Sequence, residues 1–306
     1  VSESYGQYIL RPPTIRFDRA SQKGNILYVA NSIINTGAAA QTTENPPAGT
    51  SNNNGFLANY IDIDGDATTF SSSSANLSLA SCTQVLFAGL YWGAGRGGIG
   101  GAPPANSTND TAWITAAANT IRFKLPGGAY TNITATVFDR FNQKRVQTGI
   151  PAATTTHSGY MCFANVTAMV TGLANPNGTY TLADMVGPVA AGKNAGYGGW
   201  TMVIVYADPT LQVRNLTVFD GCVVVAPAAG NVDVTVSGFT TPPTGPVSCE
   251  LGAVVIEGDR QDGADAYLFR QQGAIPFVDL TPTTPAPGNA TSRLQDMWNS
   301  TISYKG

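Results

Sequence analysis

The residues that most constrain the fold are those of the apolar run WTMVIVY, at Trp200–Tyr206. Almost every side chain in this run is aliphatic, β-branched or aromatic, and the run is too short for a stable lone helix. It is typical of a strand that is buried on both faces of a sheet. A turn follows at Ala207–Thr210, where proline fixes φ and aspartate can bond its own backbone. Strand-like residues resume at Val213–Phe219 and again at Cys222–Val225. We therefore predict a central hairpin that other strands cover.

The rest of the chain repeats this pattern of short strand-like segments between stretches of Gly, Pro, Asn and Ser. The further strand candidates are Asn25–Ile34, Asn59–Ile63, Ala75–Leu79, Gln84–Trp92, Thr120–Leu125, Tyr130–Phe138, Gly159–Phe163, Thr179–Met185, Val232–Phe239, Leu251–Glu257 and Ala266–Phe269. Only Val166–Leu173 suits one or two helical turns. The pattern predicts an all-β fold, namely an antiparallel β-sandwich or jelly roll with long polar loops.

Three regions differ in composition. Residues 1–20 contain an Arg-Pro-Pro break and are predicted to form an N-terminal arm or linker. Residues 21–280 hold the strand candidates and are predicted to form the sandwich, as one large domain or as two packed β subdomains. Residues 281–306 begin with a Pro/Thr-rich stretch, so we predict a linker and a C-terminal segment that continue into a larger chain.

Charge is scarce in this chain. Charged residues make up 11% of it, and the formal net charge is −3 with no basic block, whereas soluble domains carry about 25% charged residues. This composition argues against nucleic acid as a partner. No apolar run reaches the roughly 20 residues that a membrane helix needs, so we predict no membrane insertion. Low charge with long polar loops is typical of secreted β-proteins, and we expect an extracellular or cell-surface location.

The four cysteines are Cys82, Cys162, Cys222 and Cys249. They show no Cys-x-x-Cys spacing, and the chain has one histidine, so a zinc site is not predicted. Four cysteines allow three pairings in an oxidising compartment. We favour Cys82–Cys162 and Cys222–Cys249, because Cys222 leaves one strand and Cys249 enters another that can lie beside it. Four buried thiols are the alternative.

Asn-x-Ser/Thr triplets are glycosylation candidates in a secretory pathway. They begin at Asn76, Asn106, Asn109, Asn132, Asn165, Asn177, Asn215, Asn289 and Asn299. A chain this rich in Asn, Ser and Thr contains many such triplets by chance, and a bacterial source would leave most of them idle. Both cases agree with an extracellular protein.

Two acidic loops are candidate calcium sites, since calcium takes about six to eight oxygen ligands. The candidate ligands are Asp62, Asp64 and Asp66 in the first loop and Glu257, Asp259 and Asp262 in the second. The first loop lacks the glutamate of a full EF-hand, because Ser73 stands at the twelfth position. A solvated turn is the alternative for the first loop, and neutralisation by Arg260 is the alternative for the second.

Motifs of catalysis are missing from the sequence. There is no Gly-x-Ser-x-Gly nucleophile elbow, and the glycine-rich Gly95–Gly101 lacks the Lys-Ser/Thr of a phosphate loop. His157 stands in a Thr/Ser/Gly loop without a partner by motif. A glycosidase could use paired carboxylates from among Glu250, Glu257 and Asp62. We predict that the protein is not an enzyme and has no cofactor, unless calcium binds the acidic loops.

Four segments carry a resemblance to a known family. They are NYIDIDGDATTFSSSSANLSL at Asn59–Leu79, VLFAGLYWGA at Val85–Ala94, GWTMVIVYADPTLQVRNLTVFDG at Gly199–Gly221 and LGAVVIEGD at Leu251–Asp259. Together with DMWNSTIS at Asp296–Ser303, they resemble the N-terminal β-rich region of large bacterial cell-surface proteins that carry Ig-like repeats. The resemblance implies a secreted, non-catalytic module of an adhesive or filamentous surface protein. The four cysteines depart from the usual pattern of that family, which supports extra disulfides here.

Three functions follow as hypotheses. The first is a structural module of an extracellular filament, appendage or surface layer, whose edge strands join other copies or neighbouring modules. The second is an adhesin or carbohydrate-binding module that binds glycans. Trp113, after the long loop Gly93–Asp110, is its best exposed aromatic candidate, because Trp92 and Trp200 lie in apolar runs and are predicted to be buried. The third is a glycosidase-like enzyme.

Overall fold

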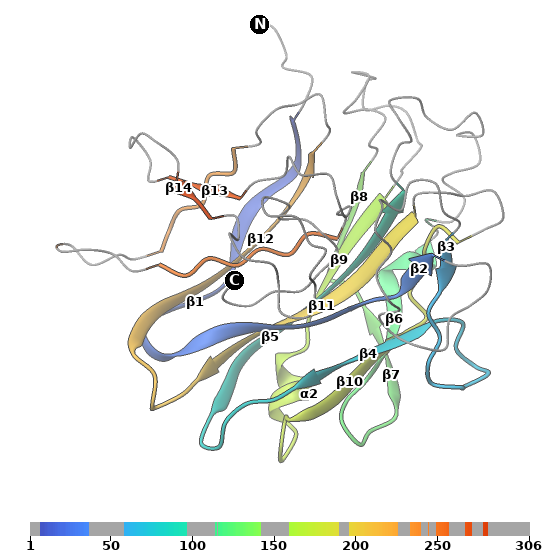
Figure 1. Cartoon of the computed structure of the whole chain (residues 1–306), viewed down its shortest axis with the longest axis horizontal. Coiled ribbons are helices and arrows are strands. Elements are labelled where there is room, and N and C mark those ends of the chain that lie inside the picture. Colours follow the sequence, from blue (N-terminus) through green and yellow to red (C-terminus); the bar gives the residue numbers. More distant parts are fainter. Residues whose placement is uncertain are drawn as a thin grey trace, which may run out of the picture.

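The fold is all-β, as the sequence predicts, and its antiparallel sheets form a β-sandwich (Figure 1). The computed structural model describes residues 7–36, 58–96, 114, 116–141, 159–189, 196–225, 233–239, 244, 249–256, 267–270 and 278–280. The predicted linker at residues 281–306 lies outside these ranges.

The larger sheet has six strands in the order β12-β1-β11-β5-β9-β8. Their bounds are β12 (Val213–Val225), β1 (Gln7–Ser32), β11 (Gly196–Ala207), β5 (Gln84–Arg96), β9 (Gly159–Asn165) and β8 (Val137–Phe141). An ion pair joins Arg11 of β1 to Asp139 of β8, although β11, β5 and β9 lie between these two strands in the sheet. The sheet is therefore strongly curled.

The smaller sheet has four short strands in the order β4-β10-β6-β7. Their bounds are β4 (Ser72–Leu77), β10 (Gly178–Ala183), β6 (Thr120–Lys124) and β7 (Tyr130–Thr134). The remaining elements are the strand pairs β2 (Ile34–Thr36) with β3 (Ala58–Tyr60) and β13 (Leu268–Phe269) with β14 (Val278–Asp279), the 3₁₀ turn η2 (Ala116–Asn119) and the helix α2 (Thr167–Thr171). The helix confirms the helical turn predicted within Val166–Leu173.

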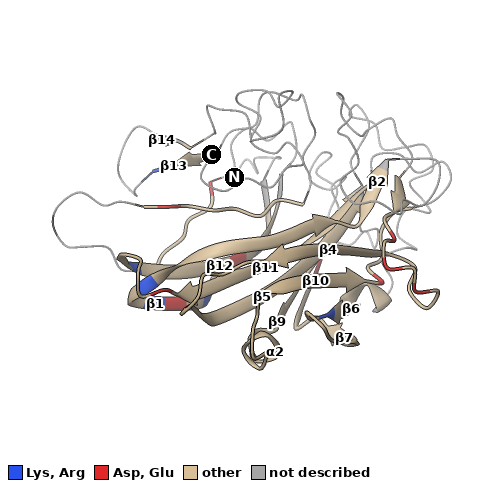
Figure 2. Cartoon of the chain, turned by 60° about the horizontal axis from the view of Figure 1, so that its bottom comes forward, with Lys and Arg blue, Asp and Glu red and all other residues tan. Residues whose placement is uncertain are grey.

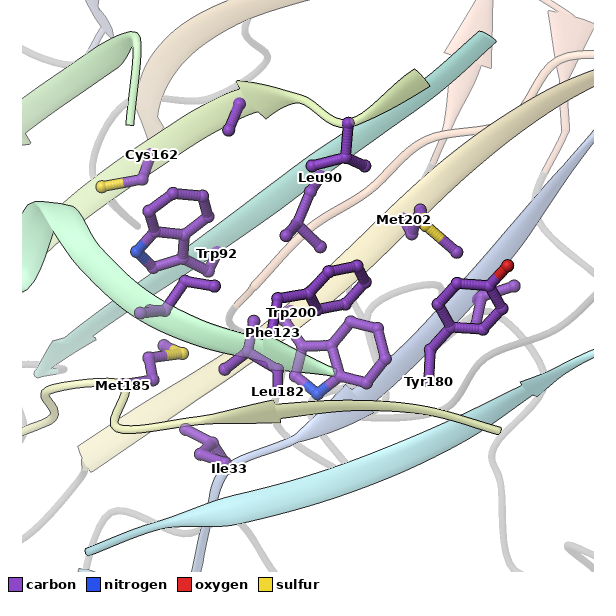
Figure 3. Close-up of a cluster of buried hydrophobic side chains, with 14 of the residues drawn as sticks. Ile33, Leu90, Trp92, Phe123, Cys162, Tyr180, Leu182, Met185, Trp200 and Met202 are labelled. Carbon is purple, nitrogen blue, oxygen red and sulfur yellow. The ribbon is translucent and has the colours of Figure 1, made fainter. Parts of the chain in front are cut away.

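The main core lies between the two sheets and contains both predicted buried tryptophans (Figure 3). Trp92 is fully buried and Trp200 is 3% exposed. Each indole N–H has an acceptor, because Trp92 Nε1 donates to the carbonyl of Ala118 and Trp200 Nε1 donates to Ser73 Oγ at 2.8 Å. The ring of Phe123 packs edge-on against Trp200, at 6.4 Å between ring centroids. These tryptophans hold the sheets together and offer no platform for a ligand.

The six-stranded sheet is buried on both faces, as the run at Trp200–Tyr206 predicts. Along β11, the side chains of Trp200, Met202 and Ile204 join the main core. The alternate residues Val203 and Val205 point to the other face, where they pack in a second cluster with Phe87 and Phe163 of β5 and β9. Burial of both faces explains why polar residues do not alternate with apolar ones in this strand.

The prediction that the two strands of the central hairpin pair with each other is wrong. These strands exist as β11 and β12, but β1 separates them. Residues 24–32 of β1 pair with β11, and residues 7–23 pair with β12. The segment predicted as an N-terminal arm is thus, from Gln7 onward, the first half of a 26-residue strand. Adjacent strands in a sequence often have a third strand inserted between them, and local turn signals do not report it.

The Arg-Pro-Pro break lies inside β1 as an irregularity of the ladder. The register with β12 shifts between Arg11 and Thr14, where Pro12 and Pro13 have no N–H to donate. Gly221 lies opposite this point, and a Cβ on Gly221 would come within 2.9 Å of the Pro13 nitrogen. The glycine therefore allows the two backbones to approach where the prolines interrupt the pairing.

Two predicted strands near the C-terminal end are not strands. The described part of Val232–Phe239, residues 233–239, pairs with no strand, although its sequence alternates. Leu251–Val255, predicted to be buried, is exposed and irregular. Both segments lie against the six-stranded sheet, through a contact of Phe239 with Phe219 and of Gly252 with the ring of Tyr28. An apolar or alternating run becomes a strand only where a neighbouring strand accepts its backbone bonds.

The predicted disulfides Cys82–Cys162 and Cys222–Cys249 are not formed, and all four cysteines are free thiols in this structure. Cys162 is 2% exposed in the main core, and its thiol donates to the carbonyl of Ala118. Cys222 is 1% exposed beside Phe141 on the second face of the six-stranded sheet. Cys82 and Cys249 are exposed. Each predicted bridge would thus join a buried thiol to a surface one. The alternative of four buried thiols is correct for two of them.

Candidate functional site

The acidic loop at Asp62–Asp66 lies on the outer face of the four-stranded sheet (Figure 2). The loop leads from β3 toward β4 at one edge of this sheet, and it reaches Tyr130 on β7 at the opposite edge. The burial pattern of β6 shows which side chains meet it, because Ile121 and Phe123 point into the core and the alternating residues point outward. Arg122, Lys124 and their neighbours on β7 therefore face the acidic loop.

Hydrogen bonds within the loop fix its shape. Asp64 Oδ1 accepts from the backbone N–H of Asp66 at 2.9 Å, and Asp66 Oδ1 accepts from both the N–H and the hydroxyl of Thr68. Gly65 between the two aspartates has φ +65°, a conformation that favours glycine. Asp62 Oδ1 accepts from Ser72 Oγ at 2.8 Å. Each carboxylate thus stabilises the turn through a local bond.

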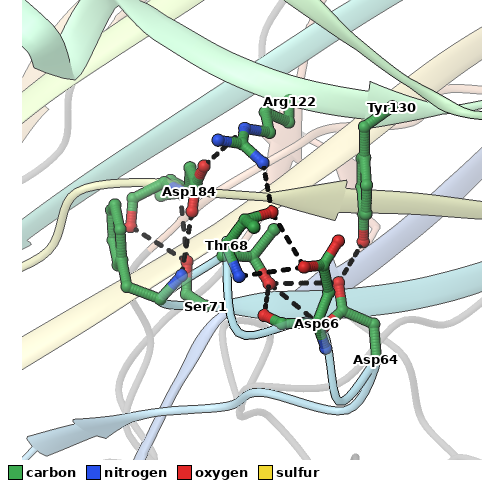
Figure 4. A network of polar contacts seen from close by, with 10 residues as sticks. Asp64, Asp66, Thr68, Ser71, Arg122, Tyr130 and Asp184 are labelled. Carbon is green, nitrogen blue, oxygen red and sulfur yellow. Dashed lines mark hydrogen bonds and ion pairs between the residues drawn. The ribbon is translucent and has the colours of Figure 1, made fainter.

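Tyr130 anchors the loop to the edge of the sheet (Figure 4). Its hydroxyl donates to Asp64 Oδ2 at 2.5 Å, and Thr69 Oγ1 donates to the same carboxylate. Burial acts to raise the pKa of Asp64, but the hydrogen bonds from Tyr130, Asp66, Thr69 and Ser72 outweigh it and hold the pKa below its usual value. Burial and the bond to Asp64 raise the pKa of Tyr130. Asp64 is therefore an acceptor and Tyr130 a donor throughout the neutral range.

Arg122 links the loop to the end of β10. Its guanidinium donates to Thr68 Oγ1 at 2.9 Å and pairs with Asp184 Oδ2 at 2.9 Å. Asp184 in turn accepts from the backbone N–H of Phe70 and has φ 58°, a conformation that is uncommon for residues other than glycine. The arginine therefore connects the loop, β6 and the residue after β10, and it fixes the position of the loop over the sheet.

An open hollow of about 400 Å³ lies beside this network. It is lined by Asp64, Asp66, Arg122, Lys124, Gly128, Ala129 and Tyr130. The ammonium of Lys124 lies over the ring of Tyr130 at 5.4 Å from its centroid. The lining therefore mixes carboxylate acceptors, cationic donors and one aromatic ring.

The calcium prediction for this loop finds no support in the geometry. Among the residues that the structure describes, no group of three or more His, Cys, Asp or Glu side chains is arranged to hold a metal ion. The oxygens of Asp62, Asp64 and Asp66 accept hydrogen bonds from the turn, which is the alternative that the sequence left open. The second predicted calcium loop, with Glu257, Asp259, Asp262 and Arg260, lies outside the described residues.

The carboxylates proposed for a glycosidase do not meet. Asp62 bonds to Ser72 at the start of β4, whereas Glu250 is exposed and pairs with Arg214 of β12 at 2.7 Å. Glu257 lies outside the described residues, as do His157 and the predicted ligand-binding Trp113. The glycosylation candidates Asn106, Asn109, Asn289 and Asn299 fall in the same undescribed parts of the chain.

A second charged cluster lies inside the curl of the six-stranded sheet, and the sequence analysis missed it. Asp220 of β12 has a side chain that is 1% exposed, and it pairs with Arg16 Nε at 2.9 Å and with Arg11. Arg11 also pairs with Asp139 of β8 at 2.9 Å. Arg16 lies over the ring of Phe163, at 4.7 Å from its centroid. Both arginines fall in the segment predicted as an arm, so only its recognition as a strand could have revealed the cluster.

The outer edge of β7 carries backbone groups that no strand among the described residues pairs with. The bond from Ala135 N–H to the Asn119 carbonyl continues the register of β6 with β7, so Ile121–Ile133 and Phe123–Thr131 are the hydrogen-bonded pairs of this ladder. The N–H and C=O groups of the alternating residues Tyr130, Asn132 and Thr134 therefore point away from β6. No strand of the described residues pairs with this edge, which lies at the rim of the sandwich in Figure 1.

Comparison of the chain with protein-family models, with curated proteins and with solved structures finds no match. No helix in the described part of the chain is long and apolar enough to cross a membrane.

Proposed function

We propose that the protein is a non-enzymatic structural module of an extracellular assembly and that it joins a second copy of itself through β7. The observation that carries this proposal is the outer edge of β7, with which no strand in the described part of the chain pairs. The other edges of the two large sheets contact other parts of the chain: Asn31 donates to the carbonyl of Ser74 on β4, Arg11 pairs with Asp139 of β8, and Phe239 and Glu250 contact residues of β12. The resemblance of four segments to the β-rich region of bacterial surface proteins supports the same function.

The edge of β7 is complementary to itself. In an antiparallel pairing of two copies centred on Asn132, that residue lies opposite its equivalent and Tyr130 lies opposite Thr134. All three residues direct their N–H and C=O groups outward, so each donor finds an acceptor in the other copy. Such an isologous contact would join two four-stranded sheets into one continuous sheet. A module with a second contact elsewhere could then extend into a filament or layer.

Proline at position 132 tests this edge. Asn132→Pro removes the N–H that points away from β6 and leaves the ladder with β6 intact, so we expect it to abolish self-association. Asn132→Ser is the matched control, because it removes the same side chain and keeps the N–H. Sedimentation velocity of unglycosylated protein should find dimers or larger species for the natural chain and for Asn132→Ser, and monomers for Asn132→Pro. Association of Asn132→Pro, or a natural chain that stays monomeric, contradicts the proposal.

A second candidate function is sugar binding in the hollow beside Tyr130. The mixed lining of Asp66, Lys124 and Tyr130 supports it. Isothermal titration with soluble oligosaccharides from a positive glycan-array spot should then give a heat signal that Lys124→Ala and Tyr130→Ala abolish. Lys23→Ala is the matched control, because Lys23 is exposed on β1 of the six-stranded sheet and does not line the hollow. Equal binding by all variants rules out this site.

A further inference from the structure

The sequons in the described residues differ in how the fold uses their asparagine side chains. Asn177 bonds to Leu79 twice, because its Oδ1 accepts from the Leu79 N–H at 2.7 Å and its Nδ2 donates to the Leu79 carbonyl at 2.9 Å. Asn76, Asn165 and Asn215 each accept a bond through Oδ1, from Thr179, Thr167 and Ser21. Asn132 is exposed on β7, and no hydrogen bond among the described residues uses its side chain.

The pair of hydrogen bonds between Asn177 and Leu79 is incompatible with a glycan on Asn177. An amide that accepts from and donates to the same residue uses the N–H that lies on the same side as its oxygen. In an N-glycosidic linkage, which is a trans amide, the sugar carbon replaces this same hydrogen. A glycan on Asn177 would therefore remove the bond to the Leu79 carbonyl and leave that acceptor without its donor, at a cost to the stability of the turn. The sequon at Asn177 serves the fold.

Asn132 has the opposite character. Its side chain stands on the outer face of the sheet, opposite Arg122, which is turned toward Thr68 and Asp184. A glycan linked to Asn132 breaks none of these bonds. Its backbone N–H and C=O, however, belong to the open edge of β7, so a glycan at this position covers the groups that a second copy would pair with.

We infer that Asn132 is an N-glycan acceptor and that its glycan controls assembly, because only copies without this glycan can pair through β7. The inference rests on the proposed function, because the effect of the glycan is defined by the self-pairing of that edge. In the pairing centred on Asn132, the two asparagines lie directly opposite each other, with Cα atoms about 5.5 Å apart and both side chains on the same face. Two glycans cannot share that space, so modification and self-pairing exclude each other.

The transfer that installs this glycan is a substitution at the anomeric carbon of an oligosaccharide carried on a polyprenyl pyrophosphate. The Asn132 Nδ2–C1 bond forms, and the bond from C1 to the pyrophosphate oxygen breaks. The lipid pyrophosphate leaves with the electron pair, and a base of the transferase takes one Nδ2 proton. Where the transfer precedes folding, the fold selects which modified chains are retained, and chains with a glycan on Asn177 are expected to be lost.

The test uses the natural chain secreted from a eukaryotic host and the same chain made in a bacterial host without glycosylation. Peptide mapping after enzymatic release of glycans in heavy-oxygen water should find Asn132 occupied and Asn177 unoccupied in the secreted protein. Sedimentation velocity should then find the copies of the secreted natural chain that carry a glycan on Asn132 monomeric and the bacterial chain associated. Two variants without this sequon, Asn132→Ser and Thr134→Ala, should associate even when secreted, although their other sequons remain.

The outcomes separate the two proposals. An unoccupied Asn132 overturns this inference alone, provided that the bacterial chain associates. An occupied Asn132 with equal association of the secreted natural chain and Asn132→Ser also overturns it alone. If Asn132 is occupied and every form is monomeric, including the bacterial chain, the proposed function fails and the effect assigned to the glycan fails with it.

Discussion

The molecule contains two clusters of charged side chains, and their surroundings give them different consequences. In the curl of the six-stranded sheet, Asp220 is 6% exposed and pairs with Arg11 and Arg16. On the outer face of the four-stranded sheet, Asp64 and Asp66 accept hydrogen bonds from the turn around them and lie at the surface. The first cluster holds distant strands together, whereas the second shapes a loop. The surroundings of a carboxylate therefore determine whether it holds distant strands together or shapes a surface loop.

Removing one charged residue from each cluster should distinguish the two clusters most clearly. A buried charge without its counter-ion destabilises the fold far more than an exposed one. Asp220→Asn leaves Arg16 and Arg11 inside the curl without the negative charge between them. We expect a loss of about 3–5 kcal/mol in the free energy of unfolding. Urea unfolding, followed by the fluorescence of the buried tryptophans Trp92 and Trp200, measures this loss. A loss below about 1 kcal/mol would mean that the cluster behaves like an exposed pair.

Thiol labelling tests the same contrast between the inside of the curl and the surface. Burial raises the pKa of Cys222 to about 12, so its thiol stays protonated and unreactive at pH 8. With reductant present, iodoacetamide should label the exposed Cys82 and Cys249 at least about a hundredfold faster than Cys222 or Cys162, since the buried pair reacts only on opening. Mass spectrometry of quenched samples gives the four rates. Equal rates contradict the burial of Cys222. If Cys82 resists labelling only when reductant is absent, then Cys82 forms a disulfide in solution.

The fold could be predicted from the sequence wherever a signal was local. Alternation and apolar runs identified β11 and β5, and the strand candidates Thr120–Leu125 and Tyr130–Phe138 contain the paired strands β6 and β7. The position of β1 between β11 and β12 could not be predicted, because strand order depends on contacts between residues that are far apart in the sequence. The same limitation concealed the Asp220 cluster, in which Arg11 and Asp220 are joined only by the pairing of β1 with β12.

The sequence singled out the aspartates of the acidic loop and left their role open. The spacing of Asp62, Asp64 and Asp66 around a glycine correctly singled out a shaped loop, and the same spacing fits both a calcium loop and a hydrogen-bonded turn. In the structure, Tyr130 and Arg122 bind the loop from across the sheet, as a hydrogen-bonded turn requires. Neither residue has a sequence signal that connects it to the loop, because both belong to a hairpin about sixty residues further along the chain.

A double-mutant cycle measures the link across the outer face. Tyr130→Phe removes the donor to Asp64, Asp64→Ala removes the acceptor, and the double variant removes both. We expect a coupling free energy of about 1 kcal/mol, because the bond is charge-assisted but partly exposed to water. Urea unfolding of the four proteins gives the value. A coupling near zero would leave the loop unattached to β7 and would widen the contrast with the Asp220 cluster.

Acid should remove the contribution of Asp64. Its pKa in the folded protein is lowered, so the stability that it provides is present above the pKa of an unfolded aspartate, about 4, and is lost as the pH falls through the folded value. The natural chain should therefore exceed Asp64→Asn by up to about 1 kcal/mol at pH 6, with the difference vanishing toward pH 2. Unfolding curves across that range test the sign. A difference that grows in acid would mean that the folded pKa is raised.

The smallest effect is expected at the exposed pair of Arg214 and Glu250. These side chains are 30% and 46% exposed and lie 2.7 Å apart, so water and salt screen their attraction. Arg214→Ala should lower the free energy of unfolding by no more than about 0.5 kcal/mol at low salt, and this loss should become smaller as the salt concentration rises. Urea unfolding at low and at high salt measures both. A loss near that of Asp220→Asn would show that Glu250 secures the segment 249–256 against β12. The exposed pair would then stabilise the fold as strongly as the buried Asp220 cluster.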